Sequence, residues 1–159
     1  MENLSQGRDE VVIDAPARTV FSVLQDSIVL PRWMPMVKAT TGKREVSGSI
    51  RECEVSFAGK EGQVTEKCID CVPNKRIAWL LVKDTLGFNK MLEDFSFSFE
   101  LIEKGENKTL VVNESFFKPK NFMAKIMVWL MIKRKFHQVR MTALTNLKKF
   151  SEEIEHVHN

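Results

Sequence analysis

The sequence predicts an α+β fold in which a seven-stranded antiparallel sheet wraps around one long C-terminal helix, with two short helices after the first strand. The long helix is indicated because residues 121–157 contain no Pro or Gly, and their apolar residues recur every three or four positions. The sheet is indicated by residues 91–102, where apolar and polar side chains alternate as in a half-buried strand. A long helix held against a curved sheet encloses a cavity, so this architecture favours the binding of an apolar molecule.

The chain begins with a strand and two short helical segments. Residues 9–13 form the first strand, and Pro16 suits the first turn of a helix that reaches about Gln25. Residues 28–33, which contain Pro31, form a second short helix or turn.

Residues 36–117 read as six further strands separated by turn residues. The turn of residues 58–62 joins two alternating runs and is a good hairpin signal, whereas residues 84–90 form a polar loop. Asn121 is placed to cap the long helix. The six strands are expected at residues 36–41, 49–57, 63–71, 76–82, 91–102 and 109–117.

Length and composition fit one domain that spans residues 1–159. The net charge of +3 is too small to indicate nucleic acid as a partner. Eleven Phe, eight Met and no Tyr predict an apolar interior with few hydroxyl groups to orient a ligand. An odd number of cysteines, a polar N-terminus and the absence of a run of about 20 apolar residues predict a cytoplasmic protein.

Three stretches carry a resemblance to a known superfamily: VVIDAPARTVFSVLQD, IVLPRWMPMV, and GSIRECEVSFAGKEGQVTEK followed by PNKRIAWLL. In these stretches and in the order of its elements, the chain resembles the START-like superfamily (also called SRPBCC), which includes the polyketide cyclase/dehydrase-like proteins. The resemblance covers roughly residues 9–155 and implies the helix-grip fold, with a deep pocket between the long helix and the concave face of the sheet. Because this superfamily carries lipids, sterols, quinones, hormones and polyketide intermediates on one scaffold, the resemblance predicts the fold and leaves the reaction open.

The candidate ligand-binding residues are apolar side chains expected to face the cavity, with a few polar groups to orient a ligand. Arg51 and either Glu66 or Glu93 would orient a polar end of the ligand. Trp33 lies in the segment that the superfamily places near the cavity entrance, and it is interpreted either as a wall residue or as a corner-packing residue. The apolar lining is predicted to be Val55, Phe57, Trp79, Phe95, Phe97, Phe99, Ile126 and Leu130.

Three carboxylates share strand parity with apolar residues. Glu66, Glu93 and Glu114 would each lose several kcal/mol of hydration if they faced an apolar cavity without a partner. An inward carboxylate therefore indicates ligand recognition, acid–base chemistry or an ion pair with Arg51; the alternative is that these residues reach solvent at strand ends. The last strand is ambiguous by one residue, which leaves Asn113 as the inward alternative to Glu114.

The sequence contains no motif that predicts a metal site, a cofactor or an identifiable set of catalytic residues. Cys68 and Cys71 form a CxxC, but in a strand positions three apart face opposite sides, and a redox pair needs a helix N-terminus. Cys53 is single, so no zinc set is formed. His137 stands among Lys and Arg residues of the long helix and is interpreted as part of a solvated face.

Residues 125–136 (KIMVWLMIKRKF) are apolar on nearly every side of the predicted helix. Three interpretations remain open: the segment covers the cavity mouth and is buried, it forms a homodimer face, or it touches a membrane surface with its neighbouring basic residues.

The first functional hypothesis is the binding or carriage of a hydrophobic small molecule, such as a lipid, a quinone or an aromatic polyketide-like compound. The alternative is a cyclase/dehydratase-type enzyme in which an inward carboxylate abstracts a proton and Arg51 stabilises the enolate. A third hypothesis is a protein-interaction module that uses the exposed part of the long helix.

Overall fold

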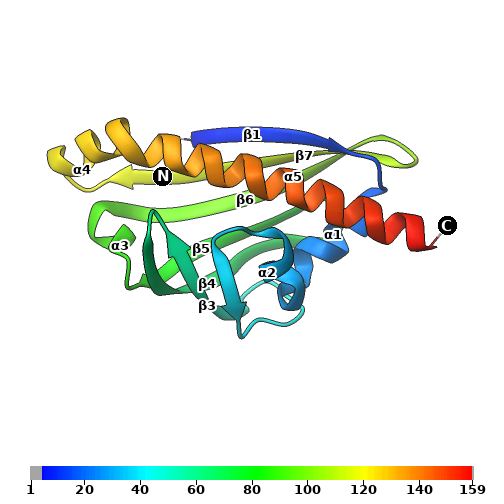
Figure 1. Ribbon diagram of the computed structural model, residues 1–159, viewed down its shortest axis with the longest axis horizontal. Helices are drawn as coiled ribbons and strands as arrows, with labels where there is room; N and C mark the ends of the chain where they lie inside the picture. The colour runs from blue at the N-terminus through cyan, green and yellow to red at the C-terminus, as the bar shows by residue number, and fades with distance from the viewer. Residues whose placement is uncertain (1–4, 159) are drawn as a thin grey trace.

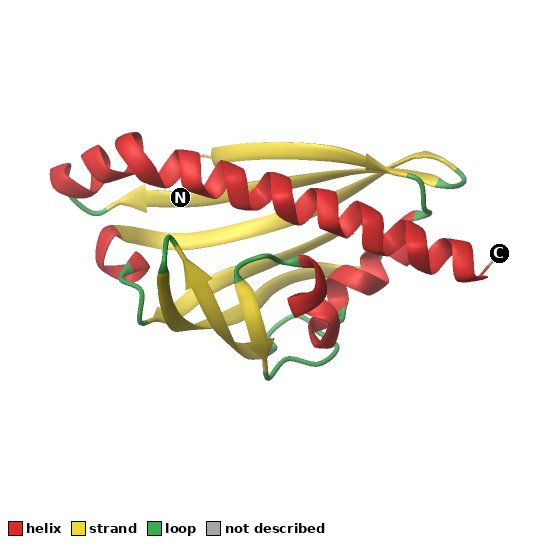
Figure 2. Ribbon diagram, in the orientation of Figure 1, coloured by secondary structure: helices red, strands yellow, loops and turns green. Residues whose placement is uncertain are grey.

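The computed structural model describes residues 5–158, and within them a seven-stranded antiparallel sheet is crossed on one face by a long C-terminal helix (Figures 1 and 2). The spatial order is β1-β7-β6-β5-β4-β3-β2, so only the β1–β7 pairing joins strands distant in sequence. The strands are β1 (Ser5–Ile13), β2 (Val37–Thr40), β3 (Ile50–Phe57), β4 (Lys60–Val72), β5 (Arg76–Asp84), β6 (Leu92–Gly105) and β7 (Lys108–Pro119). The predicted α+β fold is confirmed.

Two short helical segments follow β1, as expected, and a third segment was not predicted. The first two comprise α1 (Ala17–Gln25), then the 3-10 turn η1 (Ser27–Val29) running into α2 (Leu30–Trp33). The third, α3 (Phe88–Met91), forms within the predicted polar loop because the Asp84 carboxylate accepts hydrogen bonds from the backbone N–H groups of Phe88 and Asn89, at 2.8 and 2.9 Å. This turn brings Phe88 into the core.

The β3–β4 hairpin is tighter than the sequence indicated. Phe57 pairs with Lys60, so the loop contains only Ala58 and Gly59, both with positive φ (+50° and +79°). Such two-residue turns match the twist of the strands that they join. As a result β4 starts at Lys60, three residues earlier than expected.

The C-terminal helix is continuous in direction but contains three segments: α4 (Phe122–Met127), a π-helical turn η2 (Val128–Ile132) and α5 (Lys133–His158). Asn121 caps it as predicted, since its Oδ1 accepts the Ala124 N–H at 2.8 Å. Helix α5 contacts β1, α1 and α2, and it lies beside β1 in Figure 1. Among the described helices, none combines the length and apolar character needed to cross a bilayer.

The hydrophobic core lies between the sheet and α5. On the helix, Ala143, Leu144 and Leu147 are fully buried, and they meet residues of α1 and of the inward-facing strand positions. The core does not fill this space completely, and the remaining volume forms the candidate site.

Candidate ligand-binding cavity

A small cavity of about 80 Å³ lies between the inner face of the sheet and α5. It is much smaller than the roughly 300–1,000 Å³ of pockets that hold drug-sized ligands. Five polar residues, Arg51, Glu66, Asn113, Ser115 and Arg140, reach it. Its apolar lining is formed by Leu30, Met34, Met36, Val37, Val55, Val64, Leu81, Phe88, Phe95, Phe97, Phe136, Val139 and Ala143.

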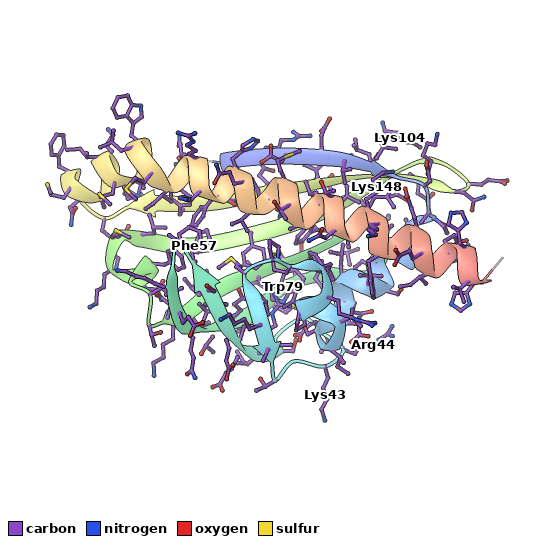
Figure 3. All side chains as sticks on the ribbon, in the orientation of Figure 1. Lys43, Arg44, Phe57, Trp79, Lys104 and Lys148 are labelled. Atoms are coloured by element: carbon purple, nitrogen blue, oxygen red, sulfur yellow. The ribbon has the colours of Figure 1, made fainter. Side chains whose placement is uncertain are left out.

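A cluster of phenylalanines occupies much of the space beside this cavity. Phe136 of α5 stacks on Phe95 with ring centroids 5.2 Å apart, and it contacts Phe57, Phe88 and Phe117 at 5.5 to 6.0 Å. These rings come from β3, α3, β6 and β7, so Phe136 connects the helix to four separate elements. In Figure 3, Phe57 lies just below the long helix, on the side of the sheet that the helix crosses. The cavity is therefore small because aromatic side chains fill its surroundings.

The first polar group at the cavity is an ion pair between neighbouring strands. Arg51 of β3 and Glu66 of β4 are directly opposed in the register, and Arg51 Nε donates to Glu66 Oε2 at 2.7 Å. Both residues are buried, and the Arg51 guanidinium also lies over the Trp79 ring, 4.2 Å from its centre. The aromatic face stabilises the cation from one side while the carboxylate does so from another.

The Arg51–Glu66 pair continues into a second buried carboxylate. Arg51 Nη1 donates to Ser27 Oγ at 2.9 Å, and the Ser27 hydroxyl donates to Glu45 Oε1 at 2.7 Å. Glu45 is buried, and its other carboxylate oxygen accepts a hydrogen bond from the Ser49 hydroxyl. This chain of hydrogen bonds supplies the partners that buried charges require.

The second polar group is centred on Arg140 of α5. Arg140 Nε donates to Asp9 Oδ2 at 2.7 Å, and its Nη1 donates to Ser115 Oγ at 3.1 Å. His137, on the same helix, lies 2.9 Å from Asp9 Oδ1 and is more than half exposed. Gly7 makes room for this arrangement, because a Cβ atom there would lie 2.4 Å from Arg140 Nη2. Helix α5 and the outermost strand β1 are thus joined by an ion pair beside the cavity.

Five of the predicted ligand-binding residues reach the cavity: Arg51, Val55, Glu66, Phe95 and Phe97; Phe57 does not line it and packs against Phe88 and Phe136 in the phenylalanine cluster. Their contact with a ligand stays a prediction.

Three large aromatic residues that were predicted to line the cavity lie behind its wall instead. Trp33, Trp79 and Phe99 are at most 1% exposed, and Phe99 packs edge-on against both indoles. The corner-packing interpretation of Trp33 therefore describes its position. The buried indole N–H groups of Trp33 and Trp79 have no hydrogen-bond partner among the described residues.

Glu93 does not face the cavity, contrary to the expectation from strand parity. The pairing of β6 with β7 shifts between Glu93 and Ser96, and Asp94 adopts a positive φ of +49°. This bulge breaks the alternation, so Glu93 is exposed while Phe95 and Phe97 point inward.

The last strand follows the alternative register. Asn113 and Ser115 are buried and reach the cavity, whereas Glu114 lies on the other face of β7. Asn113 Nδ2 donates to the Ser98 carbonyl at 2.9 Å.

The two predicted lining residues of the C-terminal helix are also absent from the cavity wall. Leu130 is 58% exposed and Ile126 is half-buried, because the buried face of this segment is formed by Ala124, Val128 and Ile132. The interpretation in which residues 125–136 are buried over the cavity mouth is therefore wrong.

The cysteines remain poor nucleophiles. Burial raises the pKa of the Cys68 thiol to about 11, and burial is also the main cause that raises the pKa of Cys53 and Cys71. The expectation that Cys68 and Cys71 face opposite sides is wrong, since a bulge between Cys68 and Asp70 lets the two thiols interact. The thiolate is the nucleophilic form of cysteine, and the raised pKa values favour the protonated thiol at neutral pH.

Asp9 and Arg140 are residues of the site that sequence reasoning missed, whereas Ser115 follows from the alternative register of the last strand that also turns Asn113 inward. Asp9 and Arg140 are separated by 131 positions, and Asp9 stands between Arg8 and Glu10, which look like an exposed surface. The only available signal was the position of Arg140 four residues after Phe136, on the apolar stripe of the helix.

The geometry defines a helix-grip protein, in which a curved antiparallel sheet and a long C-terminal helix enclose a mainly apolar cavity. Residues 6–152 match the sequence profile of the family described as polyketide cyclase / dehydrase and lipid transport, and the chain belongs to this family. A comparison with curated protein sequences gives no significant match.

Solved structures with the same fold include proteins of different kinds. A START superfamily protein from Mycobacterium smegmatis is 18% identical, with a TM-score of 0.74 over 93% of this chain and 97% of that one. The aromatase/cyclase Zhui from Streptomyces sp. R1128 is 17% identical, with a TM-score of 0.76 over 92% of both chains. The major latex-like protein 151 from Panax ginseng is 12% identical, with a TM-score of 0.75 over 95% of this chain and 99% of that one. At these identities the similarity concerns the fold, and the family as a whole supports a fold that binds hydrophobic ligands.

Proposed function

We propose that this protein binds or carries a hydrophobic small molecule with one polar group, of the lipid, quinone or aromatic polyketide-like kind, in the cavity between the sheet and α5. The observation that carries this proposal is the composition of the cavity wall, in which thirteen apolar side chains surround five polar ones. A mostly apolar lining with a few fixed polar groups is typical of ligand sites.

The polar groups are placed to orient a carbonyl, hydroxyl or carboxylate of the ligand. Arg140 is held by Asp9 and Ser115, and Arg51 is held by Glu66 and Ser27, in each case through Nε and Nη1. Both arginines line the cavity, which supports a guanidinium N–H as the donor for a ligand oxygen. Asn113 adds an amide group on the same inner face of the sheet.

Binding of such a ligand requires the cavity to expand. An engineered cavity of about 150 Å³ is known to bind benzene, and the cavity here is about half that size. Met34 and Met36 line it, and methionine side chains adapt easily to different shapes. The phenylalanine cluster around Phe136 is the larger obstacle, and its displacement opens the space for a ligand.

Binding is favoured over the cyclase/dehydratase alternative because the inward carboxylate is already engaged. Glu66 would have to leave its ion pair with Arg51 before it could accept a proton from a substrate. The interaction-module hypothesis concerns a different part of the surface and is compatible with a ligand in the cavity.

The proposal is tested by native mass spectrometry of the protein purified from its own host, followed by denaturing extraction of any bound small molecule. We expect an apolar compound in a one-to-one complex with the wild-type chain. In Val139→Phe, where a ring enters the cavity from α5, we expect the complex to be lost, whereas Thr142→Phe on the exposed side of the same helix retains it. An empty wild-type protein that also fails to bind fluorescent fatty-acid probes would contradict the proposal.

A further inference from the structure

Six large apolar side chains are exposed together at the start of the C-terminal helix. Phe122 is 74% exposed, Met123 is 69% exposed and Trp129 is 78% exposed. We call this surface the apolar tip; it consists of Phe122, Met123, Met127, Trp129, Leu130 and Met131. A contiguous exposed apolar patch on a folded protein marks an interaction surface.

The buried stripe of the helix explains why these side chains remain outside. From Ala124 to Arg140 every fourth residue is buried, and the residues between them are exposed or half-buried. A regular α-helix has 3.6 residues per turn, so strict four-residue spacing drifts away from the core unless one turn is wider. The π-helical turn Val128–Ile132 is that wider turn, and it keeps the narrow stripe inward while Trp129, Leu130 and Met131 face away.

The chain segment that carries the apolar tip has charges of one sign only, although Glu93 of β6 pairs in the sheet with Lys118 at its edge. No acidic residue occurs between Glu114 and Glu152, although the whole chain has a net charge of only +3. Six exposed basic residues border the tip, and none of them forms an ion pair within residues 5–158. They are Lys118, Lys120, Lys125, Lys133, Arg134 and Lys135.

Basic and aromatic side chains also meet in one depression on this surface. An open groove of about 550 Å³ is bordered by Phe122 and Trp129 together with Lys118, Lys125 and Lys133. Aromatic side chains favour the boundary between lipid headgroups and acyl chains, and lysines favour anionic headgroups.

We propose that the apolar tip docks on an anionic membrane surface, with Trp129 and Phe122 inserted at the headgroup level and the lysines in contact with lipid phosphates. A homodimer through the same surface is disfavoured because a two-fold axis would bring two sets of unpaired cations together. This inference concerns the outer surface of the helix and does not depend on ligand binding in the cavity.

Trp129 provides a direct measurement, because the other two tryptophans, Trp33 and Trp79, are 1% exposed and already shielded from water. We expect its emission to shift to shorter wavelength when the protein meets vesicles of phosphatidylcholine containing about one third phosphatidylglycerol. Vesicles of phosphatidylcholine alone should give no shift, and about 0.5 M NaCl should reverse it. Absence of a shift on anionic vesicles, or an equal shift on neutral ones, would overturn the proposal.

Variants at exposed positions separate docking from folding. In vesicle sedimentation, Lys125→Glu/Lys133→Glu should weaken binding by about a hundredfold and Trp129→Ser/Leu130→Ser by about tenfold. The matched controls are Lys104→Glu, at the opposite end of the molecule from α4 in Figure 3, and Ile28→Ser, at another exposed apolar side chain. Both controls should bind like the wild type, and thermal unfolding should be unchanged in all four variants.

If the apolar tip is instead a homodimer interface, the molecular mass of the protein by light scattering will be twice that of one chain in the absence of vesicles. The emission of Trp129 will then also shift to shorter wavelength as the protein concentration rises. That result would overturn the proposal, as would equal loss of vesicle binding in the control variants.

Discussion

Arg51 combines a buried ion pair, a buried hydrogen bond and a contact with an aromatic ring. It binds Glu66 and Ser27 and lies over Trp79, with an exposure of 2%. Removing one partner of a buried ion pair leaves the other charge without compensation, which costs more than the pair itself contributes.

We therefore expect Arg51→Met to lower the free energy of unfolding by about 3–5 kcal/mol, measured by urea denaturation. The double variant Arg51→Met/Glu66→Leu should recover part of this loss because the Glu66 charge is removed as well, while the buried Glu45 carboxylate still lacks the nearby arginine. Arg76→Met, which breaks the exposed ion pair with Asp70, is the matched control and should cost about 1 kcal/mol or less. Equal losses in Arg51→Met and Arg76→Met would show that the burial of the Arg51–Glu66 pair has no energetic consequence.

Strand parity predicted the inward residues where the pairing was regular and failed where it was interrupted. Arg51, Val55 and Glu66 lie where β3 and β4 pair in continuous register, and all three reach the cavity, although the β4–β5 pairing shifts between Thr65 and Glu66. Glu93 precedes a bulge in β6 that no local sequence signal marked, so its predicted orientation was wrong. Asp9 and Arg140 could not be paired from the sequence, because their contact depends on how α5 crosses β1.

At the scale of secondary structure, the π-helical turn is the feature that the sequence pattern concealed. The periodicity correctly predicted one helix from Asn121 onward, but spacings of three and four are compatible with both a regular helix and one that contains an extra residue. Leu130 lies midway between the buried residues Val128 and Ile132, so it is exposed and does not line the cavity.

If the π-helical turn holds one extra residue, deletion of Leu130 should convert it to a regular α-helical turn. The deletion would shorten the spacing between Val128 and the next buried residue, Ile132, from four positions to three, which a regular α-helix also accommodates on one face. Ala124 and Val128 would then stay buried, and we expect the free energy of unfolding to change by about 1 kcal/mol or less. Deletion of Met141 is the matched control, because α5 is a regular helix with no extra residue to lose. The deletion therefore turns the residues that follow it, including Ala143, Leu144 and Leu147, away from the core. That variant should lose about 4 kcal/mol or more, or fail to fold. The stability of both deletion variants is measured by circular dichroism during thermal unfolding. A loss of stability on deletion of Leu130 as large as that on deletion of Met141 would show that the π-helical turn does not hold an extra residue.

At the scale of the whole molecule, the sheet and the helix are held together by a core that also limits the ligand space. The seven strands, the long helix and the apolar cavity between them were expected from alternation, periodicity and the family resemblance, whereas the order of the strands in the sheet was not predicted. The cavity volume did not follow, because it depends on the rotamers of five phenylalanines that come from five elements. Stability and ligand capacity therefore compete for the same space.

Phe136 is where this competition can be measured. It is 7% exposed and contacts four other phenylalanine rings, so Phe136→Ala should lower the free energy of unfolding by about 3–5 kcal/mol. The space left by the ring adjoins the cavity, and the same variant should bind a fluorescent naphthalene probe about tenfold more tightly than the wild type. Phe21→Ala is the matched control, because Phe21 is a buried α1 side chain outside the cavity wall, and its loss should destabilise the protein without improving probe binding. If probe affinity rises equally in both variants, the probe reports general loosening of the core; if it falls in Phe136→Ala, the ring is part of the binding surface and does not restrict access to it.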